Sequence, residues 1–238
     1  MPRSADIAAQ LDSVRRRITA AAQRASRSPS DITLIAVSKT FSADDVRAAT
    51  AAGHLAFGEN RVQEAEAKKA LLEGLAIEWH LIGHLQSNKA RKAVATFDWS
   101  QSVDRIDLLR RIEVAAREAG RRPRILIQAD LAGEATKHGA DRAALGDLVC
   151  AAAEAEDVDL RGLMIVPPYP DNPEDSRPWF RQLRGIRDEL VAAGIPADRL
   201  GELSMGMSHD FDVAIEEGAT IVRVGTAIFG HRDYAAEA

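Results

Sequence analysis

Short β-forming runs alternate with longer amphipathic, helix-forming runs along almost the whole chain. The predicted strands cover residues 32–37, 54–57, 78–82, 99–103, 124–129, 160–166, 202–205 and 221–224. The predicted helices cover residues 42–52, 62–73, 88–96, 105–119, 141–154, 176–193 and 210–217, and a further helix over residues 6–27 precedes the first strand. This alternation is typical of parallel strands joined by right-handed helical crossovers.

Eight such strands in 238 residues suit a closed barrel, which needs about 250 residues, better than an open sheet. A doubly wound open sheet is the alternative. Against it, no Gly-x-Gly-x-x-Gly motif follows the first strand, where a dinucleotide-binding sheet carries it. No linker or change of composition divides the chain. We therefore predict an α/β fold, a single (β/α)8 TIM barrel domain over residues 1–238 with an extra N-terminal helix.

The composition is typical of a soluble globular protein, with 46% apolar and 28% charged residues. No uncharged apolar run approaches the roughly 18 residues that a membrane span needs. Asp6 and Asp12 lie where a secretory signal would have its apolar segment. The single Cys150 cannot form an internal disulfide, which agrees with a reducing compartment. We expect a cytoplasmic protein that does not associate with membranes.

The charge balance argues against a nucleic-acid partner, because such proteins normally carry a basic excess or a basic face. Here 31 basic residues stand against 36 acidic ones, a net charge of −5. The densest basic clusters are Arg15 to Arg17 and the pair Arg121 and Arg122. A solvated helix face explains both clusters, with a phosphate-rich partner as the alternative.

In a (β/α)8 barrel, the functional residues gather at the C-terminal ends of the strands, and phosphate often binds the loops after strands seven and eight. Those loops are Gly206-Met207-Ser208 and Gly225-Thr226 in this chain. Glycine lets backbone N–H groups approach an anion closely, and each loop also has a hydroxyl group. Ser208 also lies where the predicted helix over residues 210–217 begins, so the N-terminus of that helix would add positive potential. The alternative is that the glycines only form turns and that Ser208 only caps the helix.

Lys39 ends the first apolar strand, so we expect it near the barrel mouth. Burial there lowers the pKa of an ammonium group and frees the amine to attack a carbonyl. The alternative is a surface lysine that extends into solvent from the strand end. A phosphate site opposite an activated lysine describes a Schiff base with a phosphorylated aldehyde, and pyridoxal 5'-phosphate (PLP) is the evident candidate.

Arg223 interrupts the apolar strand Ile221-Val222-Arg223-Val224. A buried arginine needs a partner, since an unpaired buried charge costs several kcal/mol. One possible partner is the ring nitrogen of a cofactor such as PLP, where arginine would keep that nitrogen unprotonated and the ring a weak electron sink. The alternative is an ion pair with Glu59 or Asp130.

Other residues carry weaker signals. His80 and His84 lie on a strand and its turn, and Cys150 lies in a predicted helix, so we expect no metal site. Gln86, Asn88 and Lys89 line the loop after the third strand or start the following helix. Met164 and Met207 are interpreted as packing residues near the mouth. Ser208, His209 and Asp210 are consecutive, so they cannot face one another as a catalytic triad.

Seven segments of the chain carry a family resemblance. They are Ala36-Val37-Ser38-Lys39-Thr40, Phe57-Gly58-Glu59-Asn60 with Val62-Gln63-Glu64, Trp79-His80-Leu81-Ile82-Gly83, Leu85-Gln86 with Asn88-Lys89, Arg161-Gly162-Leu163-Met164, Leu203-Ser204-Met205-Gly206-Met207-Ser208 and Val222-Arg223-Val224-Gly225-Thr226-Ala227-Ile228-Phe229-Gly230. In this order and over nearly the full chain, the sequence resembles the pyridoxal phosphate homeostasis proteins. These are single-domain relatives of the alanine racemase N-terminal barrel.

The resemblance implies a cofactor-binding set of Lys39, Asn60, His80, Met207, Ser208, Arg223, Gly225 and Thr226. Lys39 would hold PLP covalently as a Schiff base, and Arg223 would face the pyridine nitrogen. Ser208, Gly225 and Thr226 would bind the phosphate, while Asn60 and His80 would lie beside the ring. Lys137 matches a loop lysine of the family. Arg61 departs from the pattern, because many members have tyrosine there.

The implied function is a carrier rather than an enzyme. We expect a monomeric protein that binds PLP, keeps the free aldehyde low and delivers the cofactor to PLP-dependent apo-enzymes. The first alternative is a PLP-dependent amino-acid racemase. Racemases of this type add a second β domain and a tyrosine from a partner subunit. This chain ends eight residues after Gly230, and its only tyrosines are Tyr169 and Tyr234. The second alternative is a Schiff-base aldolase that uses Lys39 on a phosphosugar.

Overall fold

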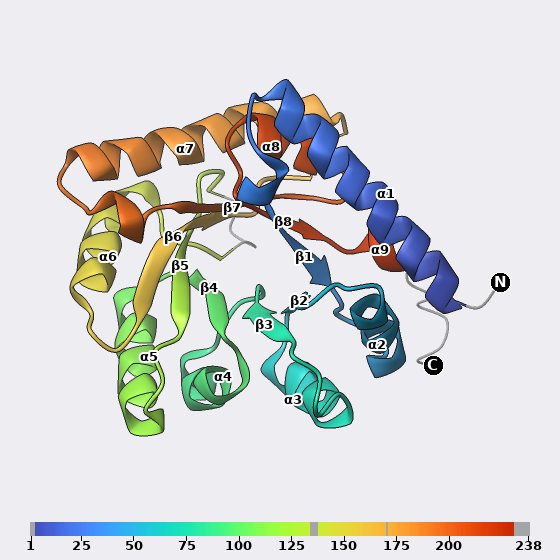
Figure 1. Ribbon diagram of the computed structural model, residues 1–238. Coiled ribbons are helices and arrows are strands. Elements are labelled where there is room, and N and C mark those ends of the chain that lie inside the picture. The colour runs from blue at the N-terminus through green and yellow to red at the C-terminus, as the bar shows by residue number, and fades with distance from the viewer. Residues whose placement is uncertain (1–2, 134–137, 170, 231–238) are drawn as a thin grey trace.

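The computed structural model describes residues 3–133, 138–169 and 171–230, and its centre is a closed barrel of parallel strands in sequential order (Figure 1). The strands are β1 (Thr33–Val37), β2 (Ala56–Glu59), β3 (Glu78–Leu81), β4 (Trp99–Val103), β5 (Arg124–Ala129), β6 (Asp159–Ile165), β7 (Glu202–Met207) and β8 (Ile221–Val224). The barrel closes because β8 pairs with β1, where Arg223 lies opposite Ile35. The predicted closed barrel is confirmed, and the open sheet is excluded.

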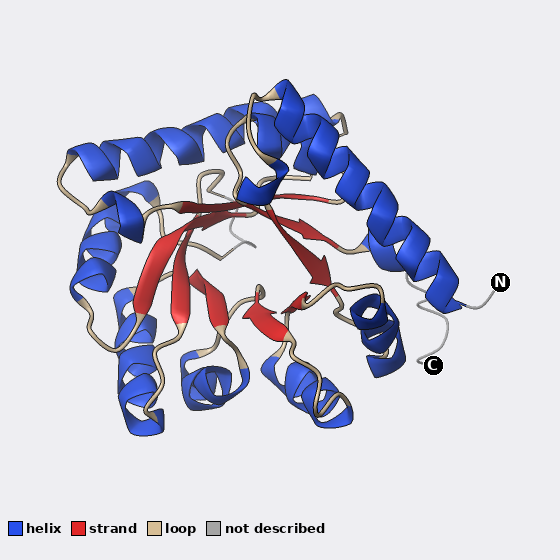
Figure 2. Cartoon of the chain, in the orientation of Figure 1, coloured by secondary structure: helices blue, strands red, loops and turns tan. Residues whose placement is uncertain are grey.

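Helices surround the strands as an outer ring (Figure 2). They are α1 (Arg3–Arg24), α2 (Ala43–Ala51), α3 (Val62–Leu71), α4 (Ala90–Thr96), α5 (Ile106–Ala119), α6 (Arg142–Glu154), α7 (Arg177–Ala192), α8 (Phe211–Glu216) and α9 (Thr226–Phe229). The extra N-terminal helix is therefore present. None of the helices within the described ranges is both long enough and apolar enough to cross a bilayer.

Local sequence signals explain where several helices begin and end. Ser42 caps α2, because its hydroxyl oxygen accepts a hydrogen bond from the Asp45 N–H and the Asp45 carboxylate bonds back to the Ser42 N–H. Gly120 ends α5 in the left-handed conformation with φ +60°, which glycine adopts without steric cost. These capping residues set the helix boundaries close to where the sequence predicts them.

Several elements begin or end one to three residues away from the sequence prediction, and β7 extends to Met207 instead of ending at residue 205. The second strand begins at Ala56 rather than at residue 54, because His54 still belongs to the turn that follows α2, where its N–H donates to the Ala49 carbonyl. The last strand is followed by the short helix α9, for which the sequence showed no clear pattern. The start of β2 lies at the N-terminal end of the barrel, whereas the end of β7 and helix α9 lie at the C-terminal strand ends, where the candidate site is.

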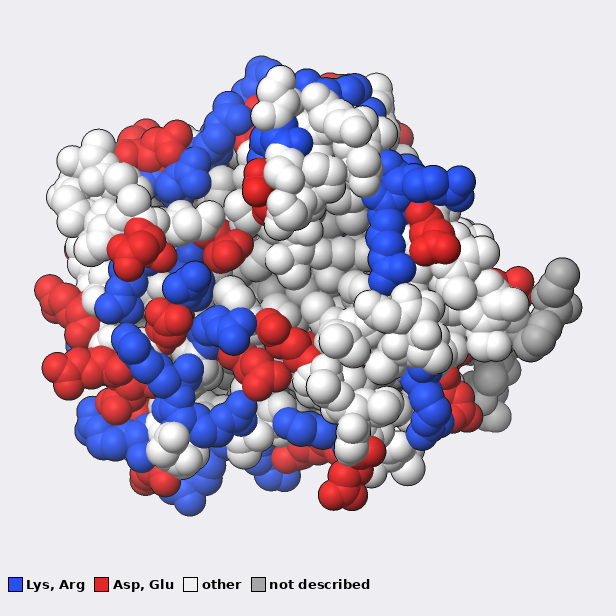
Figure 3. Space-filling view, viewed as in Figure 1, with Lys and Arg blue, Asp and Glu red and all other residues white. Residues whose placement is uncertain are grey.

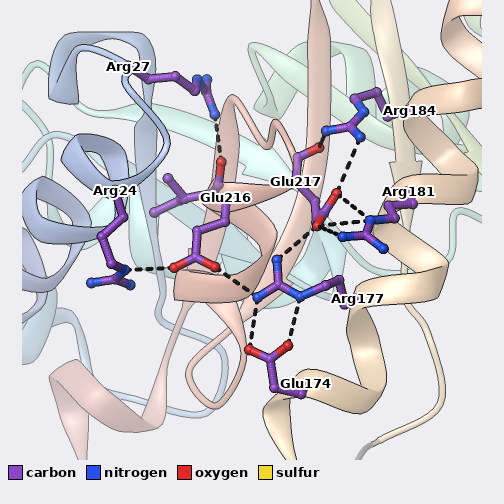
Figure 4. Close-up of polar contacts among 9 residues, drawn as sticks. Arg24, Arg27, Glu174, Arg177, Arg181, Arg184, Glu216 and Glu217 are labelled. Carbon is purple, nitrogen blue, oxygen red and sulfur yellow. Dashed lines mark hydrogen bonds and ion pairs between the residues drawn. The ribbon is translucent and has the colours of Figure 1, made fainter.

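The N-terminal helix is fastened to the barrel by a charged cluster that also involves α7 and α8 (Figure 4). Arg24 on α1 donates to the Glu216 carboxylate at 2.7 Å, and Arg177 at the start of α7 reaches both Glu216 and Glu217 at 2.8 Å. The Glu217 side chain is only 5% exposed, so several arginines are needed to compensate its buried charge. Arg181 and Arg184 supply the other contacts.

The barrel interior has an apolar layer separate from the main core. Ile35, Trp99, Leu126, Met164 and Ile221 form this layer, whereas the larger apolar core lies between the sheet and the helices. Side chains alternate between the two faces of a strand, so Arg223, two residues after Ile221, also points inward. Polar residues therefore occupy the interior above the apolar layer.

The outer surface carries both signs of charge. On the face shown in Figure 3, lysine, arginine, aspartate and glutamate side chains are intermixed over the outer helices and surround an uncharged central depression. This mixture agrees with the small net charge of −5 over the whole chain.

Candidate functional site

Arg223 on β8 is the most deeply placed charge of the candidate site. Its Nη1 donates to the Ser204 hydroxyl at 2.6 Å, and its Nη2 donates to the Ile165 carbonyl at 2.8 Å. Burial lowers the pKa of its guanidinium to about 10, and the Asp210 carboxylate acts in the opposite direction. The alternative considered for Arg223, an ion pair with Glu59 or Asp130, is wrong. The Glu59 carboxylate pairs with Lys68 instead, and the Asp130 carboxylate accepts hydrogen bonds from N–H groups of its own loop.

A line of polar side chains crosses the barrel interior from Arg223 to His80. The Ser204 hydroxyl donates to Gln101 Oε1 at 2.6 Å, and Gln101 Nε2 lies 3.1 Å from His80 Nδ1. The His80 ring stacks on Trp99 with 5.3 Å between the ring centroids. Arg223 and His80 thus belong to one hydrogen-bonded network through two side chains, Ser204 and Gln101, that the sequence analysis missed.

His80 is held as a neutral ring. Burial lowers the pKa of its imidazole, although the neighbouring Glu78 carboxylate acts to raise it. Since Gln101 Nε2 is a donor, His80 Nδ1 accepts and the proton lies on Nε2. That nitrogen is 3.2 Å from the Glu78 carboxylate, and the interaction with His80 is the main cause that lowers the pKa of Glu78 to about 2.

The loops after β7 and β8 meet through Ser208. Its hydroxyl oxygen accepts hydrogen bonds from the Gly225 N–H at 3.1 Å and the Ala227 N–H at 3.4 Å. Gly225 also lies against the end of β1, since a Cβ atom at this position would be 3.3 Å from the Val37 carbonyl oxygen. The ends of β1, β7 and β8 therefore converge, and they place backbone N–H donors and a hydroxyl group together.

The expected role of Ser208 at a helix start is wrong. Helix α8 begins only at Phe211, because Asp210 closes a turn in which its carboxylate accepts the Met207 N–H at 2.7 Å. Met207 is the last residue of β7 and is half-buried, and Thr226 is exposed in the first turn of α9. Met207 and Thr226 lie at the same strand ends as Ser208. The N–H groups near the Ser208 hydroxyl come from the loop after β8, at Gly225 and Ala227, and not from the start of α8.

Gly206 is required by the close approach of α8 to β7. Its φ is +91°, and a Cβ atom there would lie 2.5 Å from the Ala214 Cβ and 2.9 Å from the Phe211 Cα. A larger residue would push α8 outward and move the Ser208 turn. Gly206 therefore allows both the positive φ of the turn and the close packing of α8 against β7.

Lys39 lies two residues beyond the end of β1 and is half-buried. The next residue, Thr40, has φ +68°, which is unusual for a β-branched residue and costs conformational energy. The Thr40 N–H donates to the Glu64 carboxylate. The strained turn is thus held by a partner on α3, and it sets the direction in which the Lys39 side chain leaves the backbone.

A second set of contacts fixes the same turn from behind. Lys68 on α3 donates through Nζ to the Ser38 carbonyl at 2.6 Å, to Glu59 at 2.7 Å and to Glu64 at 2.8 Å. The Ser38 hydroxyl donates to the same Glu59 oxygen at 2.7 Å. The sequence analysis missed Lys68, although its spacing of four residues from Glu64 on a helix is a signal for an ion pair.

Asn60 follows β2 and is half-buried at the mouth. A Cβ atom at Gly83 would lie 2.4 Å from the Asn60 carbonyl oxygen, so the loops after β2 and β3 are in direct contact. Asn88 and Lys89 lie in the short 3-10 turn Ser87–Lys89 that precedes α4. Lys137, the other lysine singled out in the sequence, lies outside the described residues.

Comparisons with known proteins agree with this arrangement. The family model for the alanine racemase N-terminal domain matches residues 9–233. The pyridoxal phosphate homeostasis protein of Aquifex aeolicus is 44% identical over 225 residues, which cover 94% of this chain and 98% of the relative. The chain belongs to this family.

Two further family members are equally similar. The pyridoxal phosphate homeostasis protein of Escherichia coli K12 is 44% identical over 236 residues, covering 96% of this chain and 98% of the relative. The structure of PipY from Synechococcus elongatus with PLP bound is 44% identical, has a TM-score of 0.84 and covers 94% of this chain and all of that one. The family resemblance and the barrel predicted from the sequence are therefore confirmed.

Proposed function

We propose that this protein binds PLP at the C-terminal ends of its barrel strands, with Lys39 forming a Schiff base to the cofactor, and that it acts in PLP homeostasis. Its relatives carry that name, and the PipY structure holds PLP. The observation that carries the proposal is the close approach of Gly225 to the end of β1, where a Cβ atom at Gly225 would lie 3.3 Å from the Val37 carbonyl oxygen. This contact brings the end of β1, two residues before Lys39, next to the loop whose N–H groups would bind an anion, and it supports the proposal that the Lys39 amine reacts with the aldehyde of a phosphorylated cofactor.

The donor set suits the phosphate of PLP. The N–H groups of Gly225 and Ala227 converge on the Ser208 hydroxyl, and Thr226 adds a second hydroxyl at the same strand end. Backbone N–H groups and hydroxyls are common ligands of phosphate oxygens in barrels of this type. Ser208, Gly225 and Thr226 would therefore bind the phosphate.

The hydrogen-bonded network in the barrel interior, from Arg223 to His80, suits the ring of PLP. Arg223 has N–H donors and no acceptor, so next to the pyridine nitrogen it would favour the unprotonated form. An unprotonated ring is a weak electron sink, which opposes turnover of amino acids. We propose that Asn60, His80 and Met207 lie beside the ring and that the protein is a carrier without catalytic turnover.

The decisive experiment is covalent labelling of the purified protein. The protein should absorb in the near-visible range, and borohydride reduction followed by peptide mapping should place the pyridoxyl label on Lys39. Lys39→Ala should lose both the absorption and the label, whereas the control Lys89→Ala should keep them. A label on Lys89 or Lys137 in the wild-type protein would refute the assignment. Colour in the purified protein would also exclude the aldolase alternative, which needs no PLP.

The proposed role extends to other proteins. We propose that the monomeric, cytoplasmic protein releases PLP to PLP-dependent apo-enzymes. Mixing the loaded protein with such an apo-enzyme should restore that enzyme's activity faster than spontaneous release into buffer allows. If restoration proceeds only at the spontaneous release rate, the role is limited to buffering free PLP.

A further inference from the structure

Two histidines and an aspartate from three different loops meet at the barrel mouth. His84 follows β3, Asp104 follows β4, and His138 follows β5, and one ligand atom of each lies within 4.8 Å of the others. The two imidazole rings stack with 3.6 Å between their centroids. The proposed PLP site does not use this cluster, and the spacing of His80, His84 and Cys150 in the sequence did not predict it.

The distance between His84 and Asp104 already suits two ligands of one ion. His84 Nδ1 lies 3.5 Å from Asp104 Oδ2, and this buried nitrogen has no hydrogen-bond partner. Bonds of about 2.0–2.2 Å to a tetrahedral zinc ion separate neighbouring ligand atoms by roughly 3.4 Å. The pair is therefore too far apart for a strong hydrogen bond but correctly spaced to share a cation.

The Asp104 carboxylate is oriented by its neighbour Arg105. Arg105 Nη1 binds the other oxygen, Oδ1, at 2.7 Å, while its Nε binds Asp107 at 2.9 Å. The Asp104 side chain is only 7% exposed. Asp104 Oδ2 thus remains directed at His84. The positive charge of Arg105 is shared between the carboxylates of Asp104 and Asp107. Such outer contacts orient metal ligands in known sites.

The backbones that carry both histidines are also anchored to strands. The Ser102 hydroxyl donates to the Gly83 carbonyl at 2.7 Å, directly before His84. The Gln128 side chain on β5 donates to the His138 carbonyl, and Ala140 bridges to Ala129. The exposed His138 ring is stacked on His84, so its ligand nitrogen lies within 4.8 Å of the ligand atoms of His84 and Asp104.

The ligand atoms of the cluster are of the types that bind transition metals. Burial lowers the pKa of His84, and the neighbouring His138 ring acts in the same direction. Neutral imidazole nitrogens with one carboxylate oxygen are typical ligands of zinc and similar divalent transition metals, whereas magnesium and calcium prefer oxygen alone.

We propose that His84, Asp104 and His138 form a binding site for a divalent transition-metal ion of the zinc class at the mouth of the barrel. The three protein ligands leave one tetrahedral position for water or an anion from solvent. A bound ion would link the loops after β3, β4 and β5 and stabilise the folded protein. The inference is independent of the proposed PLP function.

The test begins with the purified protein after removal of metals by a chelator. Titration with Zn²⁺, followed by calorimetry, should show one site per chain, and Co²⁺ should give the visible absorption of a tetrahedral nitrogen and oxygen site. Zn²⁺ should also raise the melting temperature, because it binds the folded state. Mg²⁺ and Ca²⁺ should produce neither effect.

Matched variants locate the ion. His138→Ala, at an exposed position, and Asp104→Asn should each weaken Zn²⁺ binding by about 100-fold or more, since changes to outer contacts alone cost 10–100-fold. Cys150→Ser, at the exposed free cysteine, and His209→Gln, in the loop after β7, should bind as the wild type does. Unchanged binding in His138→Ala, loss in either control, no binding at all, or equal binding of Mg²⁺ would overturn the proposal. Melting without metal shows whether each variant is folded.

Discussion

Lys68 Nζ lies 2.7 Å from Glu59 Oε1, and both side chains are buried at the back of the turn that carries Lys39. Burial raises the pKa of the Glu59 carboxyl, while the Lys68 charge acts to lower it. The second Glu59 oxygen has no hydrogen-bond partner, so the carboxylate depends on Lys68 and Ser38. This ion pair joins α3 to the ends of β1 and β2, and it fixes the backbone from which Lys39 projects.

Lys68→Met should therefore destabilise the protein strongly. Removing one partner of a buried ion pair leaves an uncompensated charge, which costs about 3–5 kcal/mol. Urea unfolding measures the loss. The control Lys69→Met, at the neighbouring exposed lysine, should change stability far less. The double variant Lys68→Met with Glu59→Gln should recover part of the stability, because the unpaired charge is gone. Equal stabilities of Lys68→Met and Lys69→Met would contradict this interpretation.

The double variant Ser208→Ala with Thr226→Ala should weaken PLP retention while leaving the absorption band in place. Phosphate contacts contribute affinity, whereas the bond to Lys39 determines the colour. Charge-assisted hydrogen bonds contribute roughly 1.5–3 kcal/mol each, so the affinity should fall tenfold or more. Dialysis against buffer, followed by absorption, measures retention. Ser30→Ala, in the 3-10 turn Pro29–Asp31 that precedes β1, is the control. Unchanged retention in the double variant would place the phosphate elsewhere.

Amino acids should not be racemised at enzymatic rates. Arg223 would keep the PLP ring a weak electron sink, so the Cα proton of a bound amino acid should leave slowly. The measurement is deuterium exchange at Cα, followed by NMR in D2O with stoichiometric protein and alanine or serine. Exchange with racemisation at about 1 s⁻¹ or faster, typical of enzymes, would favour the racemase alternative over the carrier.

Stability should depend on pH through His54. Burial lowers its pKa to about 4 in the folded protein, and Arg15 adds to this, while the Ala56 carbonyl opposes it. The unfolded chain, with an ordinary pKa near 6.5, binds this proton more readily. The stabilising contribution is therefore complete above pH 6.5 and is lost as the pH falls toward about 4. It amounts to about 3 kcal/mol.

The variant His54→Gln should flatten this dependence. Its amide can still donate to the Ala56 carbonyl, which the His54 ring contacts at 2.8 Å, but it does not titrate. Urea midpoints between pH 4 and 7 measure the slope, with His209→Gln as the control that keeps His54. An unchanged slope in His54→Gln would show that other groups cause the pH dependence.

The strand-end residues of the candidate site could be predicted from the sequence, but the interior network could not. Lys39, Ser208 and Arg223 stand next to glycines and strand ends that local patterns identify. Ser204 and Gln101 lie within short strands that are buried on both faces. Such strands show no alternation of polar and apolar residues, so their inward side cannot be identified from the pattern.

The sequence by itself determined the order of strands and helices, the closure of the barrel and the segments that carry the family resemblance. These features follow from local periodicity, capping residues and motif spacing, which are contained in neighbouring residues. Only the tertiary structure decided that Lys68 holds the Lys39 turn, that Ser208 binds N–H groups of the next loop, and that His84, Asp104 and His138 meet. The physical reason is that barrel closure and stagger bring together residues 17 to 54 positions apart in these contacts.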